Sequence, residues 1–152
     1  MKHVLLFLLV SLTSVHCNKD EEETQNQDEI DNQIILQYIA DNDLEAMNIG
    51  SGVYYVDEIT GSGENPDPSS TVRVAYTGYF TDGEIFDQSS EEGVVFGLNQ
   101  VIQGWRIGIP FFKEGGRGKL LIPSGLAYGN QPPSGIPANS VLIFDIYLIE
   151  VL

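Results

Sequence analysis

The chain has a single tryptophan, Trp105, and the residues around it are the first candidates for a functional site. Trp105 ends the segment VIQGW (101–105), so two β-branched residues and a glycine stand just before the indole. Five other segments place an aromatic or β-branched residue beside a turn residue: VAYTGYF (74–80), GEIFDQS (83–89), AYG (127–129), GIP (135–137) and LIFDI (142–146). A lone Trp is often a core residue, because truncating one in a core costs roughly 3 to 5 kcal/mol. The alternative is that these segments together line one apolar cup that binds a ligand without a nucleophile.

Histidine and cysteine, the side chains most used in nucleophilic and metal chemistry, are scarce. The chain has two histidines, His3 and His16, and a single cysteine, Cys17. Removal of residues 1–16 as a signal peptide would leave no histidine, and lipidation would occupy the one thiol. That arrangement excludes Ser-His-Asp and Cys-His catalysis and any metal site built from His or Cys. We therefore expect no metal and no cofactor.

Acidic residues dominate the charge of the chain. The 22 Asp and Glu against 7 Lys and Arg give a net charge of −15. Residues 17–52 hold ten acids and one base, whereas residues 53–152 hold twelve acids and five bases, so the N-terminal part is more charge-dense. Such a chain repels nucleic-acid phosphates, so nucleic acid is not expected as a partner. A length of 152 residues allows one domain and an extension.

The first 16 residues are typical of a secretory signal peptide. Lys2 and His3 precede the apolar run 4–10, which is too short to span about 30 Å of hydrocarbon but suits the core of a signal peptide. Cys17 follows in the position of the lipidated first residue of a bacterial lipoprotein. The residues before it, Ser14-Val15-His16, depart from the usual cleavage pattern, so an uncut or differently cut signal is the alternative. We expect an exported cell-envelope protein, held to the outer membrane only by lipid on Cys17, on its periplasmic or surface face.

The acidic segment after Cys17 is predicted to lead into a helix. Residues 17–27 are expected to be a disordered tether, because residues 18–27 include no apolar side chain. An amphipathic helix is predicted from Asp28 to about Asn42, because apolar residues recur there at helical spacing: Ile30, Ile34, Ile35, Tyr38 and Ile39. So short a helix must pack on the domain, on a second copy or on a partner. Gly50-Ser51-Gly52 is a hinge-like break, so residues 28–52 are taken as helix and linker.

Residues 53–152 are predicted to form one domain of five or six antiparallel strands. Strand patterns lie at 53–59, 72–80, 85–87, 94–98, 119–122 and 142–151, with a loop at 61–70 and a hairpin turn at 81–84. The helical signal in this domain lies at 103–109 and is stopped by Pro110. The fold class expected is α+β: a curved antiparallel sheet wrapped around one short helix, with an N-terminal helical extension.

The same segments, taken in order, resemble one protein family. Residues 53–152 resemble the FKBP-type peptidyl-prolyl cis-trans isomerases through their YTG, FD, VIxGW, AYG, IP and second FD blocks. The resemblance implies the family's half-wrapped sheet around a short helix and catalysis of Xaa-Pro isomerisation without a cofactor. It also implies proline-containing polypeptides as substrates and binding of macrolide inhibitors.

The resemblance further implies a role for ten residues. Trp105 would form the floor of a proline pocket. Six residues would form its walls: Tyr76, Phe86, Phe96, Val101, Ile102 and Phe144. Asp87 would be a buried acid, Tyr128 would hold a hydroxyl over the rim, and Ile136 would be the apolar lip of the loop before the last strand. The Ile102 N–H and the Tyr128 hydroxyl would hold the carbonyls that flank the proline.

Two features separate this chain from compact members of that family. The segment between Asp87 and Phe96 is shorter and has no Arg or Lys to pair with Asp87, and the loop NQPPS (130–134) is shorter too. These changes support a second hypothesis, a weakly catalytic or non-catalytic chaperone or binding module of an envelope complex. The intact set of Trp105, Tyr128, Asp87 and Phe144 favours the isomerase.

Overall fold

The computed structural model describes residues 19–152, with side chains from residue 26 onward. The predicted signal peptide and Cys17 lie outside the described residues. In chain order the elements are α1 (Lys19–Asp41), β1 (Ala46–Asn48), β2 (Tyr54–Ile59), β3 (Thr71–Tyr79), β4 (Ile85–Gln88), β5 (Val94–Gly97), η1 (Leu98–Gln100), α2 (Gln103–Gly108), η2 (Ile109–Phe111), β6 (Arg117–Ile122), η3 (Ser124–Leu126) and β7 (Leu142–Val151).

One antiparallel sheet forms the centre of the domain. Its order is β1-β2-β6-β7-β3-β4, and β5 also pairs with β3. The long strands β3 and β7 lie side by side from Val72 opposite Val151 to Tyr79 opposite Ile143, with one register shift. The predicted α+β fold is confirmed, with seven strands where five or six were expected.

Helix α2 packs on one face of this sheet. Alternation along β7 points Leu142, Phe144, Ile146 and Leu148 to the same side, into a core that includes Trp105. Two glycines let α2 approach closely: a Cβ on Gly108 would lie 2.6 Å from Leu120 Cδ1, and one on Gly104 would lie 2.7 Å from Ile122 Cδ1. The prediction of a short helix ended by Pro110 is confirmed, because α2 ends at Gly108 and continues only as η2.

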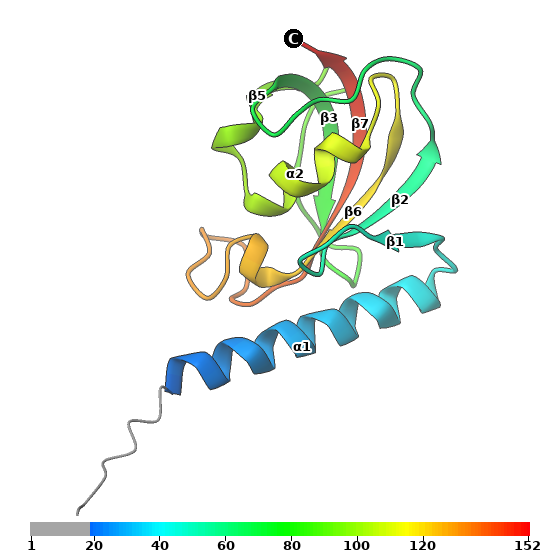
Figure 1. Cartoon of the computed structure of the whole chain (residues 1–152). Helices are drawn as coiled ribbons and strands as arrows, with labels where there is room; N and C mark the ends of the chain where they lie inside the picture. The colour runs from blue at the N-terminus through cyan, green and yellow to red at the C-terminus, as the bar shows by residue number, and fades with distance from the viewer. Residues whose placement is uncertain (1–18) are drawn as a thin grey trace, which may run out of the picture.

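Helix α1 packs on the opposite face. Ile35 is fully buried in a second apolar cluster with Tyr54, Val56, Leu121 and Ile143, whose positions alternate with those of the first core. In Figure 1, α1 runs beneath the domain and its N-terminal end projects beyond it. The sequence left open whether this helix packs on the domain, on a second copy or on a partner. The structure shows that it packs on the domain. Of the predicted apolar stripe, Ile30 and Ile34 are 40% and 38% exposed.

Two expectations about this region were wrong. The helix begins at Lys19 rather than Asp28, so residues 19–27, expected to be a disordered tether, are helical. Gly50-Ser51-Gly52 is a tight turn between β1 and β2 rather than a hinge, and all three residues have positive φ, of 106°, 52° and 78°. The Val53 N–H donates to Gly50 O across this turn at 3.0 Å. Strand β1, with only three residues, gave no periodic signal.

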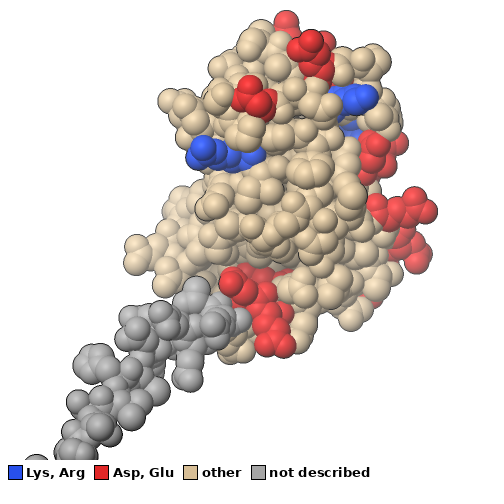
Figure 2. All heavy atoms as spheres, viewed as in Figure 1, with Lys and Arg blue, Asp and Glu red and all other residues tan. Residues whose placement is uncertain are grey.

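The described surface is acidic. Over residues 19–152, no helix combines the length and the hydropathy that crossing a bilayer requires. Figure 2 shows that one face of the domain is mostly uncharged, with acidic side chains below it and along one edge.

Candidate active site

Trp105 lies in the first turns of α2 and is 4% exposed. Three aromatic rings stand nearly perpendicular to its indole: Tyr76 at 5.1 Å and 86°, Phe144 at 5.3 Å and 82°, and Phe96 at 5.6 Å and 86° between centroids. Perpendicular pairs of this kind are each worth about 0.5 to 1.5 kcal/mol beyond the area they bury. The indole is thus held as a rigid floor by rings from three strands.

The sheet register places these rings. Tyr76 and Gly78 of β3 lie opposite Ile146 and Phe144 of β7. Gly78 also pairs with Asp87 of β4, so Phe86 lies next to that pairing. Because Gly78 has no side chain, the Phe86 and Phe144 rings lie over its backbone and meet each other at 5.6 Å and 89°. A glycine near the end of a long strand therefore makes room for two walls.

These side chains enclose a cavity of about 290 Å³. Its lining consists of Tyr76, Phe86, Asp87, Phe96, Gln100, Val101, Ile102, Trp105, Tyr128 and Phe144. Nine of the ten residues predicted for the site are in this set. Ile136 is not, and it packs against the edge of the same apolar cluster instead. Gln100, at the end of η1, is the lining residue that sequence reasoning missed, because a polar residue before the VIQGW segment carries no signal of its own.

Asp87 lies at the rim and is exposed, so its prediction as a buried acid was wrong. The Tyr76 hydroxyl donates to Asp87 Oδ2 at 2.7 Å. Within the described part of the chain Asp87 forms no ion pair, as expected from the segment without Arg or Lys. A tyrosine hydroxyl, rather than a basic residue, holds this carboxylate.

Two tyrosine hydroxyls face the cavity as neutral donors. Burial raises the pKa of Tyr76, and its hydrogen bond to Asp87 and the charge of that carboxylate raise it further. Burial also raises the pKa of Tyr128, and the charge of Asp87 adds to the effect. Both hydroxyls therefore keep their protons well above neutral pH. The Tyr128 side chain is 39% exposed, which places its hydroxyl where a ligand can reach it.

Ile102 supplies a backbone group to the same cavity. Its carbonyl accepts from the Trp105 and Arg106 N–H groups at the start of α2, at 3.1 and 3.2 Å. The Ile102 N–H has no hydrogen-bond partner among residues 19–152, so it is available to a ligand carbonyl. The indole Nε1–H of Trp105 is likewise buried and unpaired within that range.

In the described part of the chain, no group of three or more His, Cys, Asp or Glu side chains is placed to hold a metal. A larger hollow of about 550 Å³ is lined by Glu58, Glu91, Arg117 and Asp145 among others, and its charged lining does not suit a proline ring. The aromatic cavity is the better candidate for the function implied by the sequence.

Comparison with known proteins agrees with this geometry. The family profile of the FKBP-type peptidyl-prolyl cis-trans isomerases matches residues 62–149. A relative from Aeromonas hydrophila, named FKBP-type peptidyl-prolyl cis-trans isomerase FkpA, is 38% identical over 144 residues, which are 92% of this chain and 51% of the relative. The FkpA of Escherichia coli K12 is 48% identical over 101 residues, which are 65% of this chain and 37% of that protein.

Solved structures show the same fold. A peptidyl-prolyl cis-trans isomerase from Pseudomonas syringae aligns with a TM-score of 0.74 and 30% identity, covering 84% of this chain and 95% of that one. The crystal structure of FkpA from Escherichia coli aligns with a TM-score of 0.71 and 35% identity, covering 86% of this chain and 62% of that one. The chain belongs to the FKBP-type peptidyl-prolyl cis-trans isomerase family. It spans about half the length of the first of the curated relatives, 51%.

Proposed function

We propose that this protein accelerates cis–trans isomerisation of Xaa-Pro bonds in polypeptides, without covalent chemistry. The observation that carries the proposal is the cavity of about 290 Å³ with an indole floor, aromatic walls and donors at its rim. That volume is at the low end of the range of roughly 300 to 1,000 Å³ for ligand pockets, and it suits one proline ring with its flanking bonds.

The mechanism follows from the properties of the imide bond. Rotation must break amide resonance over a barrier of about 18 to 20 kcal/mol. The planar ground state is dipolar and well solvated, whereas the twisted state is less so, and an apolar cavity therefore favours the twisted state. The Ile102 N–H and the Tyr128 hydroxyl would hold the carbonyls that flank the proline. Only binding that is tighter for the twisted state accelerates the reaction.

A matched pair of substitutions tests this proposal. Phe86→Leu changes a half-buried wall of the cavity, and Phe111→Leu makes the same change at a ring of η2 that is 43% exposed and outside it. In a protease-coupled assay on an Xaa-Pro peptide, the unchanged protein and Phe111→Leu should be active, and Phe86→Leu should lose most of its activity. Equal activity in both variants would contradict the assignment of the cavity. Peptide binding without turnover would instead indicate the binding module.

We propose further that the substrates are exported envelope proteins and that lipid on Cys17 anchors the enzyme. The support is the apolar run 4–10 followed by the single cysteine of the chain. Helix α1 begins at Lys19, two residues after Cys17, so its first turn would lie close to the anchor. Intact-mass analysis of membrane fractions should find acyl mass on Cys17. Cys17→Ser should release the protein and Ser14→Ala should not, whereas an unmodified thiol in the native protein would contradict the anchor.

A further inference from the structure

Asp31 of α1 is a fully buried carboxylate at the contact between α1 and η3. Its Oδ2 accepts from both the backbone N–H and the hydroxyl of Ser124, at 2.7 and 2.6 Å. Its Oδ1 accepts from Gln27 Nε2 at 2.7 Å. Ser124 itself is 1% exposed. Both oxygens of Asp31 are thus satisfied inside the protein, and the interaction joins residues 93 positions apart.

Asp31 supplies the capping hydrogen bond at the start of η3. The residue before η3 is Pro123, which makes no capping hydrogen bond, because its side chain has no acceptor. The first N–H of η3, that of Ser124, is instead satisfied by Asp31 from another element. Helix α1 therefore determines where this short turn begins.

The turn in question holds Tyr128. The Ser124 carbonyl accepts from the N–H groups of Ala127 and Gly129, at 3.0 and 2.9 Å. These are the residues on either side of Tyr128, whose side chain lines the aromatic cavity. Ser124 thus connects two sets of hydrogen bonds, one to Asp31 and one to the neighbours of Tyr128. Any shift of Ser124 would move the Tyr128 hydroxyl relative to the indole floor.

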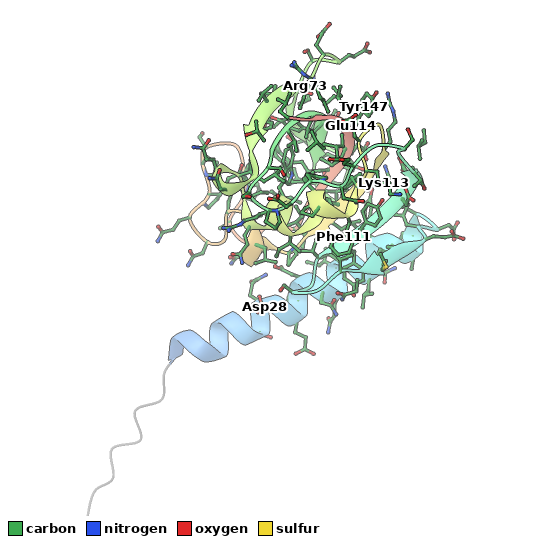
Figure 3. The ribbon with its side chains drawn as sticks, turned by 45° about the horizontal axis from the view of Figure 1, so that its top comes forward. Asp28, Arg73, Phe111, Lys113, Glu114 and Tyr147 are labelled. Atoms are coloured by element: carbon green, nitrogen blue, oxygen red, sulfur yellow. The ribbon has the colours of Figure 1, made fainter. Side chains whose placement is uncertain are left out.

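Several contacts fix helix α1 on the domain, so it can hold Ser124 in place. Ile35 is buried one turn beyond Asp31, and the Tyr54 hydroxyl donates to Asn32 Oδ1 at 3.1 Å. Asp28, one turn before Asp31, lies on the part of α1 that passes beneath the domain, whereas Arg73, Glu114 and Tyr147 lie at the other end of the sheet (Figure 3). A Cβ on Gly125 of η3 would lie 3.6 Å from Asp28 Oδ1, so α1 follows η3 closely. All of α1 lies outside residues 62–149, which match the family.

We propose that Asp31 is a positioning residue for Tyr128. By fixing Ser124 it holds the Tyr128 hydroxyl over the cavity, so α1 contributes to turnover without touching the substrate. The inference rests on the proposed role of the Tyr128 hydroxyl as a donor to the substrate. It makes the N-terminal helix a part of the enzyme rather than only a spacer.

A double-mutant cycle on the full chain tests this coupling. Tyr128→Phe should lower kcat/KM about 2- to 13-fold, the factor that corresponds to one net hydrogen bond of about 0.5 to 1.5 kcal/mol. Asp31→Ala should cause a loss of similar size, and the variant with both changes should lose little more than either alone. Effects that multiply would contradict the proposal, because a general loss of packing would act equally in both backgrounds.

Three variants control for stability and chemistry. Asp31→Asn should recover most of the activity, because an amide oxygen can still accept from Ser124. Ser124→Ala removes the hydroxyl that donates to Asp31 but keeps the backbone N–H, so its loss of kcat/KM should be smaller than that of Asp31→Ala. This variant replaces Asp31→Ala if the latter does not fold. Asn32→Ala removes a hydrogen bond from α1 to β2 instead of η3, and it should leave kcat/KM unchanged. A loss in Asn32→Ala equal to that in Asp31→Ala would contradict the proposal.

Amide hydrogen exchange gives a readout that does not depend on activity. In Asp31→Ala the N–H groups of Ala127 and Gly129 should exchange faster, and in Asn32→Ala they should not. If the unchanged protein does not isomerise proline peptides, the proposed function fails, and these exchange rates still decide whether Asp31 positions the Tyr128 turn. Unchanged exchange at both amides in Asp31→Ala would overturn the positioning role.

Discussion

Gly78→Ala tests whether turnover depends on the positions of the Phe86 and Phe144 rings. Gly78 itself does not line the cavity. A Cβ at Gly78 would lie 2.7 Å from Phe86 Cζ and 2.8 Å from Phe144 Cε1. Carbon atoms in ordinary contact are about 3.5 to 4.0 Å apart, so each ring must move by roughly 0.7 Å or more. The substitution adds no polar group and needs no positive φ, because Gly78 is not among the residues with positive φ. Its effect is therefore confined to the two walls.

The expected magnitudes follow from that displacement. Overpacking of a buried site costs about 1 to 3 kcal/mol of unfolding free energy, which denaturant titration measures. A misplacement of about 1 Å in a site can cost up to about 100-fold in rate. We expect kcat/KM to fall about 10- to 100-fold, or about 1.4 to 2.7 kcal/mol in transition-state stabilisation.

Gly125→Ala is the matched control for this change. Its added Cβ would meet one atom, Asp28 Oδ1, at an ordinary 3.6 Å. Both stability and kcat/KM should stay close to those of the unchanged protein. A folded Gly78→Ala variant with full catalytic efficiency would refute the placement of Phe86 and Phe144 as the walls on which turnover depends.

The described contacts lead to three further predictions. The kcat/KM for a short Xaa-Pro peptide should vary less than about threefold between about pH 6 and 8.5, because the raised pKa values of Tyr76 and Tyr128 keep both hydroxyls protonated there; a bell-shaped profile would instead show a titrating participant. The same shifts favour the folded state below the unfolded tyrosine pKa of about 10, so stability should fall as the pH rises above that value, which thermal unfolding at a series of pH values would show. Ile35→Ala should lower the unfolding free energy by about 2 to 5 kcal/mol, because Ile35 is fully buried between α1 and the sheet; a change below about 0.5 kcal/mol in denaturant titration would mean that α1 is not docked.

Local patterns were enough to predict most of the sheet. Alternation predicted β3 and β7 to within a residue or so, and Pro110 marked the end of α2. These features depend on neighbours in the sequence, which a single chain reveals. The site residues were named from the resemblance to the FKBP-type isomerases, and nine of those ten residues line one cavity.

The features that were missed depend on contacts across the fold. Residues 19–27 have no apolar residue, so no periodicity indicated that α1 extends through them. The exposure of Asp87 follows from its place at the sheet rim, and the bond between Asp31 and Ser124 joins segments 93 residues apart. In the sequence, the neighbours of Asp31 and Asp87 resemble those of any surface acid. Only the packing of the folded chain shows that Asp31 is buried and that Asp87 is exposed at the rim.

The most direct test of the central claim is exchange spectroscopy by NMR on an Xaa-Pro peptide with a catalytic amount of the full chain. The uncatalysed bond interconverts in tens to hundreds of seconds. We predict faster exchange between the cis and trans signals at unchanged populations, and loss of the acceleration when a macrolide ligand of this family occupies the cavity above Trp105. Exchange at the uncatalysed rate in the presence of the folded protein would contradict the account.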